Sequence, residues 1–292
     1  MNLTNVIINY RRYLKRRNYS QHTLKTYLNK LRQFVLWVDV PIEHVNYDKI
    51  IAYIDYLLDR RLRPETINCH LKSIRRFYSY MRDEKQIAIS NPVKTGCKLR
   101  ISQPLPKHLK DQEVIRLFNV IKSNRDRAMF MLMLRCGLRV EEVANLSLAA
   151  IDWRRSRLYV FNGKGQKDRV VYISHDTYKA LADYVKQRLS LRVKKVFLVQ
   201  KGTHKGKPLS VRGIQKRMEY YAKKTGLPVS CHQLRHTMAT QLLNADAEIE
   251  TIQDLLGHNW ITTTERYMTV SNVKVERDYY KAMGKVLRRS RN

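Results

Sequence analysis

The sequence predicts a mainly helical chain that contains a small antiparallel β-sheet and is divided into two domains. Its 292 residues correspond to about two domains of roughly 150 residues each, and 43% of them are hydrophobic, enough to form two ordinary cores. Over the first 90 residues, apolar side chains recur at helical spacing with no strand pattern between them. Strand character is concentrated in residues 158–174, where β-branched and aromatic runs flank the turn-forming tetrapeptide Asn-Gly-Lys-Gly.

Four helices account for the first domain. Apolar residues spaced three or four apart predict the first two helices within residues 3–14 and 24–38, and Ser20 is the expected N-cap of the second. The third helix is expected to start near Asn46. The fourth opens with Pro64, which is favourable there because the first turn has no helical partner for the missing N–H group.

The domain boundary is predicted at residues 91–108, after a first domain that covers residues 1–90. This segment contains prolines, turn-forming residues and several lysines and arginines, but no sustained periodicity, and it is interpreted as a basic linker. Such a linker would let two basic domains close around a common partner as a clamp. The second domain, residues 109–292, is expected to contain the hairpin, a further strand near residue 151, helices near residues 111–122, 126–136, 140–146, 174–190, 210–225, 232–245, 248–257 and 261–269, and a C-terminal helical segment from about residue 272.

The chain is strongly basic. It has 57 lysines and arginines against 25 aspartates and glutamates, which gives a formal net charge of +32. This excess is larger than solubility requires and both domains share it, so a polyanionic partner is expected to contact both. A nucleic acid fits best, because each phosphate that the protein neutralises releases condensed counterions. A polybasic membrane-surface role is the alternative, but basic residues spread over the whole chain fit it less well than a local lipid patch would.

The sequence also indicates where the protein works. No apolar run approaches the ~20 residues that span a bilayer, and the N-terminus lacks the hydrophobic stretch and cleavage site of a signal peptide. The four cysteines stand far apart without a C-x-x-C pair, which fits a reducing compartment better than a disulfide framework. We therefore expect a cytoplasmic protein with no membrane partner.

One short segment places several functional groups together. In His232-Gln-Leu-Arg235-His236, positions i, i+3 and i+4 share one face of a helix, and this face suits either a phosphate or a metal ion. A metal site would combine His232 and His236 with Cys231, but neither a second cysteine pair nor an H-E-x-x-H motif is present. The other alternative is a basic surface turn without a specific ligand.

Further candidates have weaker local signals. Arg139 follows a helix-ending glycine, and Glu142, three residues on, is placed to orient its guanidinium; an ordinary surface ion pair is the alternative. Lys164 lies at the tip of the predicted hairpin, where a lysine is most often a solvated charge. His258 follows a glycine that ends an apolar helix, and Tyr267 stands in a threonine-rich segment.

Taken in order, these residues resemble the motif set of the tyrosine recombinase, or phage integrase, family. The matching positions are Arg139, Lys164, the H-x-L-R-H segment with His232 and Arg235, the Leu-Gly-His that ends at His258, and Tyr267. The match covers residues 136–267, and the helical domain before it is similar to the family's SAM-like core-binding domain. Met-Thr follows Tyr267 where many members have Thr-His, outside the catalytic set. Because the helical domain begins almost at the first residue, the resemblance is to the compact Xer-like or mobile-element type.

The resemblance implies an α+β catalytic domain and a site-specific DNA recombinase that works through a covalent 3′-phosphotyrosine. Arg139 and Arg235 would bind the non-bridging oxygens of the scissile phosphate, whose negative charge grows during in-line attack. Tyr267 would be the nucleophile and His232 the base that accepts its proton. Lys164 would protonate the leaving 5′ oxygen, and His258 would hydrogen-bond to the phosphate.

By the same resemblance, the functional unit is a homo-oligomer. Four protomers would assemble on two double-stranded DNA sites and exchange strands through a Holliday junction, for integration, excision or resolution. The segment from about residue 272 would pack on a neighbouring protomer, or else in cis. No metal or other cofactor is expected, because the Arg, Lys and His cations take its place.

Other functions remain as alternatives. A type IB topoisomerase would use nearly the same site to nick and reseal one strand, without synapsis of two sites. A non-catalytic DNA-binding protein would explain the charge but not the ordered residues. An RNA-binding module is disfavoured, because the sequence has no RRM-like aromatic pair and no KH-type G-x-x-G loop.

Overall fold

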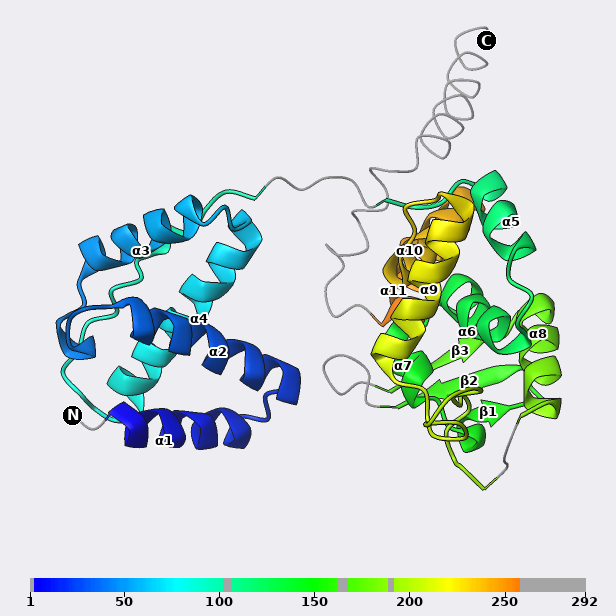
Figure 1. Ribbon diagram of the computed structural model, residues 1–292, viewed down its shortest axis with the longest axis horizontal. Coiled ribbons are helices and arrows are strands. Elements are labelled where there is room, and N and C mark those ends of the chain that lie inside the picture. Colours follow the sequence, from blue (N-terminus) through cyan, green and yellow to red (C-terminus); the bar gives the residue numbers. More distant parts are fainter. Residues whose placement is uncertain (1–2, 102–106, 162–167, 189–191, 258–292) are drawn as a thin grey trace, which may run out of the picture. The chain divides into compact units, whose positions relative to one another are not determined.

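The chain divides into two compact units, residues 1–103 and 104–292, each of which is described here by itself. The computed structural model describes residues 3–101, 107–161, 168–188 and 192–257. Unit 1 is helical, and unit 2 combines helices with a three-stranded antiparallel sheet (Figure 1), as the sequence predicts. No helix within these ranges is both long and apolar enough to cross a lipid bilayer. The finer division into a domain, a linker and a catalytic domain stays a prediction.

The helices of unit 1 begin at the residues that the sequence indicates. Its described residues form α1 (Leu3–Arg16), α2 (Gln21–Trp37), α3 (Tyr47–Asp59) and α4 (Pro64–Asp83), with short 3-10 turns at Ile42–His44 and Thr95–Cys97. The Oγ atom of Ser20 accepts a hydrogen bond from the Thr23 amide at 3.1 Å, and Oδ1 of Asn46 accepts one from the Lys49 amide at 3.0 Å. These side chains satisfy amides that have no partner within the first turn of a helix.

The core of unit 1 is rich in tyrosine. Tyr10 of α1 meets Phe77 of α4 edge to face, with ring centroids 5.3 Å apart, and both side chains are fully buried. The buried Tyr53 hydroxyl lies 2.9 Å from Nδ1 of His70, whose pKa is lowered to about 4, first by burial and then by the charge of Lys30. Tyrosines of this unit therefore serve packing, and tyrosine content by itself does not point to a nucleophile.

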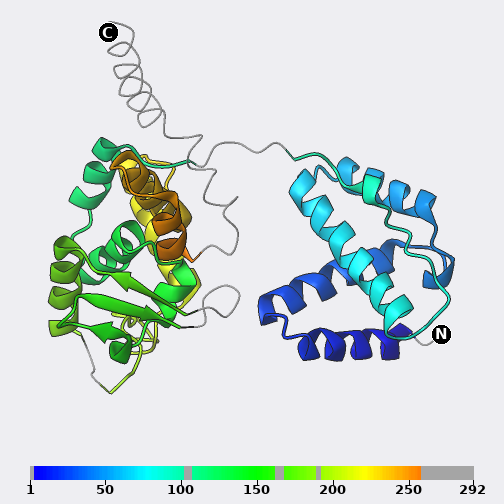
Figure 2. The same cartoon turned by 180° about the vertical axis from the view of Figure 1, so that it is seen from behind.

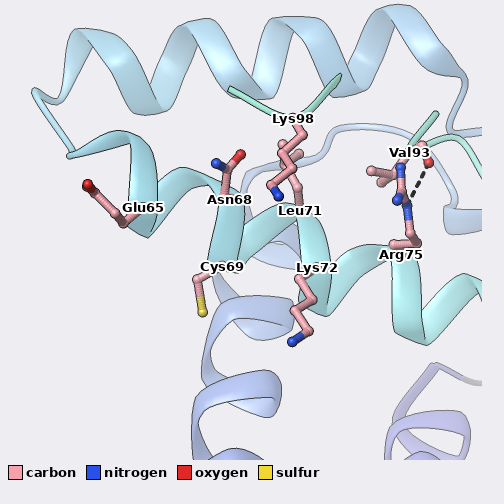
Figure 3. A pocket seen from close by; sticks show the side chains of 8 residues that line it. All are labelled: Glu65, Asn68, Cys69, Leu71, Lys72, Arg75, Val93 and Lys98. Atoms are coloured by element: carbon pink, nitrogen blue, oxygen red, sulfur yellow. Dashed lines mark hydrogen bonds between the residues drawn. The ribbon is translucent and has the colours of Figure 1, made fainter. Parts of the chain in front are cut away.

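The chain that follows α4 is fastened back onto that helix. Asn68 donates from Nδ2 to the Leu99 carbonyl oxygen and accepts from the Leu99 amide, both at 2.9 Å. Arg75 donates from Nε to the carbonyl oxygen of Val93 at 3.1 Å. A pocket of about 500 Å³ lies beside these contacts. Figure 3 shows the side chains that line it: Glu65, Asn68, Cys69, Leu71, Lys72, Arg75, Val93 and Lys98.

Unit 2 is built from helices around a small sheet. Its described elements are α5 (Asp111–Asn119), α6 (Asn124–Arg135), α7 (Val140–Asn145), a 3-10 turn (Leu148–Ala150), β1 (Ile151–Asp152), β2 (Arg157–Val160), β3 (Arg169–Tyr172), α8 (His175–Lys186), α9 (Val211–Thr225), α10 (Cys231–Asn244) and α11 (Ile249–Leu256). The strands pair antiparallel in the order β1-β2-β3, with Val160 opposite Arg169 in the last register position. Figure 2 shows this sheet from behind. The predicted hairpin and the strand before it are thus confirmed.

The core of unit 2 surrounds α6, in which residues 128–134 are buried on every side. This helix packs against α8 and α10, so α10, which carries His232 and Arg235, rests on the most buried element of the unit. The first turn of α6 is set by Ser123, whose hydroxyl accepts from the Asp126 amide at 3.4 Å; the helix therefore begins two residues before the predicted start.

Some predicted elements differ from the structure or lie outside the described residues. α5 ends at Asn119 rather than near residue 122, and α8 ends at Lys186 rather than near residue 190. Residues 195–209 take part in two isolated antiparallel bridges that were not predicted from the sequence. Lys195 pairs with Ser147, and Leu198 pairs with Pro208. The helices expected at residues 261–269 and from about residue 272 lie outside the described residues.

Candidate functional site

Arg139 stands at the beginning of α7, where its backbone and its side chain both meet Glu142. The Arg139 amide donates to Oε2 of Glu142 at 2.7 Å, and Nη1 of Arg139 donates to Oε1 at 2.9 Å. Glu142 is the third residue of the helix, the position from which a carboxylate reaches back to the cap amide. The local sequence Arg-Val-Glu-Glu therefore fixes the guanidinium of Arg139 relative to the axis of α7.

A second arginine, which no sequence motif indicated, binds the same carboxylate. Arg169, the first residue of β3, donates from Nη1 to Oε1 and from Nη2 to Oε2 of Glu142, both at 2.8 Å, and from Nε to the Leu255 carbonyl oxygen at 2.9 Å. Burial alone would raise the pKa of Glu142, but the hydrogen bonds and charges of Arg169 and Arg139 outweigh it and lower that pKa to about 2. Glu142 is therefore an anion held between two guanidinium groups.

Arg235 of α10 is almost fully buried, with 1% of its surface exposed. It donates from Nη1 to the carbonyl oxygen of Gly137 and from Nη2 to the carbonyl oxygen of Leu256. Such a buried cation needs strong acceptors, and these two carbonyls belong to the segments that end α6 and α11. The position of Arg235 is thus set by two helix ends that are far apart in the sequence.

Two glycines make these contacts possible. Gly137 has φ +64°, and a Cβ atom there would lie 2.7 Å from Sδ of Met238 and 3.0 Å from Cδ2 of Leu256. Gly257 has φ +58°, and its carbonyl oxygen accepts from Nη2 of Arg139 at 3.1 Å. The carbonyl of one glycine therefore binds Arg235 and that of the other binds Arg139, which brings both arginines to the same two helix ends.

The two histidines of the H-x-L-R-H segment lie next to each other. The rings of His232 and His236 have centroids 4.2 Å apart and are inclined by 75°, and His232 is exposed to solvent in the first turn of α10. Cys231 directly precedes His232 in the sequence and is buried, and burial raises the pKa of its thiol to about 11. Among the described residues, no three His, Cys, Asp or Glu side chains are grouped as metal ligands would be. The metal hypothesis for Cys231, His232 and His236 has no geometric support here.

Three candidate residues, Lys164, His258 and Tyr267, lie outside the described residues. Their places in the chain are nevertheless bounded: Lys164 stands between β2 and β3, and His258 directly follows Gly257. Of the predicted set, the structure brings together Arg139, Glu142 and Arg235 through the segments at Gly137 and Gly257. The sequence offered one signal for Arg169, namely a cationic residue at the start of the second strand of the predicted hairpin. It gave no indication that Glu142 is the partner of this arginine.

Known proteins resemble both units. The sequence profile of the Phage integrase family matches residues 107–273, and the profile of the Phage integrase N-terminal SAM-like domain matches residues 7–85. The tyrosine recombinase XerC of Thermodesulfovibrio yellowstonii is 32% identical to this chain over 262 residues, which are 86% of either protein.

Solved structures share the fold. The Tn1549 transposon integrase in complex with transposon right end DNA has a TM-score of 0.76 and 18% identity, over 90% of this chain and 94% of that one. A lambda integrase tetramer bound to a Holliday junction has a TM-score of 0.71 and 20% identity, over 91% and 76% of the two chains. Together with the SAM-like profile, these likenesses confirm the predicted fold class of a helical core-binding domain and an α+β catalytic domain.

Proposed function

The chain belongs to the phage integrase family of tyrosine recombinases, and on this premise we propose that it is a site-specific DNA recombinase acting through a 3′-phosphotyrosine intermediate. The observation that carries this proposal is the convergence of Arg139 and Arg235 on main-chain carbonyls at the ends of α6 and α11. Two guanidinium groups fixed by main-chain carbonyls form a preorganised site for a phosphate whose charge increases in the transition state. The family supplies the reaction, and this geometry supplies its electrostatic part.

The first strand cleavage is a substitution at phosphorus. The Tyr267 oxygen attacks the scissile phosphate in line, a new O–P bond forms, and the bond from phosphorus to the 5′ oxygen breaks. His232, which is exposed at the start of α10, accepts the phenol proton, and Lys164 donates a proton to the departing 5′ oxygen. The products are a 3′-phosphotyrosine and a free 5′ hydroxyl.

Arg139, Arg235 and His258 hold the phosphate during this step. The two arginines donate hydrogen bonds to the non-bridging oxygens, and His258 adds a third donor. Since Arg235 is only 1% exposed, DNA binding has to uncover its guanidinium before it can meet the phosphate. The energy of the broken bond is kept in the phosphotyrosine linkage, so a 5′ hydroxyl from a second strand rejoins the DNA by the reverse reaction without a nucleotide cofactor.

We also propose the finer features of the assembly. Both units contribute to the net charge of +32, and lysines such as Lys72 on α4 and Lys98 beside that helix would bind the phosphate backbone. Four copies would synapse two double-stranded sites and resolve them through a Holliday junction, as the lambda integrase tetramer bound to such a junction suggests. The protein would act in the cytoplasm, where the DNA and a reducing environment are found.

The decisive experiment separates recombination from topoisomerase activity. The chain's binding site is first selected from a pool of randomised duplexes, and one plasmid then receives two copies of it. A recombinase produces inverted or excised DNA only from the two-site plasmid. Relaxation of supercoils at equal rates with two sites, one site or none, and without rearranged products, would instead establish the topoisomerase alternative.

A further inference from the structure

We propose that Arg169 is a positioning residue for strand cleavage, which holds Glu142 so that Arg139 presents its guanidinium to the phosphate. The proposal rests on the function proposed above, since it needs Arg139 to bind the scissile phosphate. It assigns to the start of β3 a role that neither the motif pattern nor the charge of the chain indicates.

The contact between Arg169 and Glu142 has the geometry of a forked ion pair. Both terminal nitrogens of the guanidinium donate to the two carboxylate oxygens at 2.8 Å, and the side chains of both residues are 9% exposed. Arg139, in contrast, reaches the carboxylate through a single side-chain nitrogen, at 2.9 Å. The plane of the carboxylate is therefore set by Arg169, because a bidentate pair fixes orientation more strongly than a single hydrogen bond.

The way in which Arg169 and Arg139 share the Glu142 carboxylate determines the orientation of the Arg139 guanidinium. With one nitrogen on Glu142 and another on the Gly257 carbonyl at 3.1 Å, the Arg139 guanidinium is held at two points from different segments. If Arg169 were absent, the buried Glu142 would be left with Arg139 as its remaining arginine partner among these contacts. The carboxylate would then be able to turn and form a fork with Arg139, which would draw that guanidinium away from the phosphate.

Arg169 also joins two segments that carry other members of the proposed site. It lies opposite Val160 at the end of the β2–β3 pair where the connecting segment joins the two strands, and Lys164 belongs to that segment in the sequence. Its Nε donates to the carbonyl oxygen of Leu255 at 2.9 Å. A Cβ atom on Gly257 would lie 3.0 Å from Cδ of Arg169, so this glycine leaves the space that the arginine side chain occupies. The side chain of Arg169 thus connects β3 with Glu142 of α7 and with the end of α11.

An ordinary structural ion pair is the competing explanation, and the chain offers a matched control for it. Arg217 of α9 pairs with the fully buried Asp126, in the first turn of α6, at 2.7 Å, and none of its contacts in the described structure is with Arg139, Glu142, Gly137 or Gly257. Arg217→Gln therefore removes an arginine from a buried carboxylate in the same unit without touching the proposed phosphate site, although Arg217 is more exposed (35%) than Arg169 (9%).

The experiment compares Arg169→Gln and Arg217→Gln with the parent on a nicked duplex carrying the selected site. We first measure the thermal midpoint of each protein. At a temperature below the lowest of these midpoints, we then measure the rate of covalent complex formation at saturating DNA and the dissociation constant for uncleaved DNA. We expect Arg169→Gln to cleave at least about tenfold more slowly with DNA affinity within about threefold of the parent, and Arg217→Gln to cleave within about twofold of the parent. Parent-like cleavage by Arg169→Gln, or equal losses in both variants, would overturn the proposal.

A second variant covers the case in which Arg169→Gln does not fold. Arg169→Lys keeps a positive charge beside Glu142, but one ammonium group cannot bind both carboxylate oxygens and the Leu255 carbonyl at once. We expect this variant to fold and to cleave at least about threefold more slowly than the parent; cleavage at the parent's rate would refute the positioning role. If the parent itself formed no covalent complex, the recombinase proposal would fail, and this outcome is distinct from a failure of the Arg169 proposal.

Discussion

The guanidinium of Arg139 donates from Nη2 to the main-chain carbonyl oxygen of Gly257, 3.1 Å away, and so ties the beginning of α7 to the end of α11. Arg235 makes the complementary connection from α10 to the Gly137 carbonyl, two residues before Arg139. Arg139 is therefore positioned by Gly257, the residue before His258, and Arg235 by Gly137, which lies just before Arg139. These bonds exist without DNA, so both guanidinium groups have fixed main-chain anchors before a phosphate arrives, and the change that DNA binding has to add is exposure of the buried Arg235.

Removal of Arg139 should affect chemistry more than binding. We expect Arg139→Ala to lower the single-turnover cleavage rate by about 10²- to 10³-fold, the loss typical of a donor to a developing oxyanion, while affinity for uncleaved DNA falls far less. Arg135→Ala is the control, since Arg135, at the end of α6, forms an exposed ion pair with Asp176 of α8. A rate for Arg139→Ala equal to that of the control would show that Arg139 does not stabilise the transition state.

The close approach at Gly137 gives a prediction about stability. Gly137→Ala should lower the free energy of unfolding by more than about 2 kcal/mol. The new methyl group would clash with Met238, and the alanine backbone would be held at an unfavourable positive φ. Gly206→Ala is the matched control: Gly206 has φ +81°, and a Cβ atom there would have open space around it. Its substitution should cost only the backbone strain, about 1 kcal/mol. Chemical denaturation measures both, and equal losses would contradict the packing argument.

Glu142 predicts a specific pH dependence of stability. Its pKa of about 2 in the folded chain lies below the ordinary value of 4.5, so its ionised form stabilises the fold above about pH 4.5, and this contribution is lost as the pH falls through about 2. We expect Glu142→Gln to be less stable than the parent by about 3 kcal/mol near neutral pH, with a difference that shrinks steadily below pH 5. Urea titrations from pH 7 to pH 2.5 test this, and a difference that stays constant would be inconsistent with it.

Local features of the fold were predictable from the sequence, and contacts between distant segments were not. Ser20 and Pro64 begin their helices as expected because capping depends on neighbouring residues. The arginine at the start of β3 escaped prediction because its partner Glu142 stands on another element, and no periodicity connects the two. Residues 195–209 were missed for a related reason: their isolated bridges are too short to create an alternating pattern.

The charge of the chain predicts steep salt dependence. With a net charge of +32 spread over both units, the interface should neutralise many phosphates, and the logarithm of the association constant should fall linearly with the logarithm of the salt concentration. Lys72→Ala, at the pocket beside α4, should reduce this slope by about one if that lysine contacts the backbone. Fluorescence anisotropy with the selected duplex measures both slopes. A flat salt profile would contradict a phosphate-dominated interface.

The proposed nucleophile, Tyr267, is tested by trapping the covalent protein–DNA complex. The parent, Tyr267→Phe and Tyr220→Phe, a control at a half-exposed tyrosine of α9, are incubated with the nicked duplex and then boiled in detergent. We expect a covalent protein–DNA complex with the parent and with Tyr220→Phe, and none with Tyr267→Phe, because the phenyl ring has no oxygen to attack the phosphate. A covalent complex formed by Tyr267→Phe at the parent's level would contradict it.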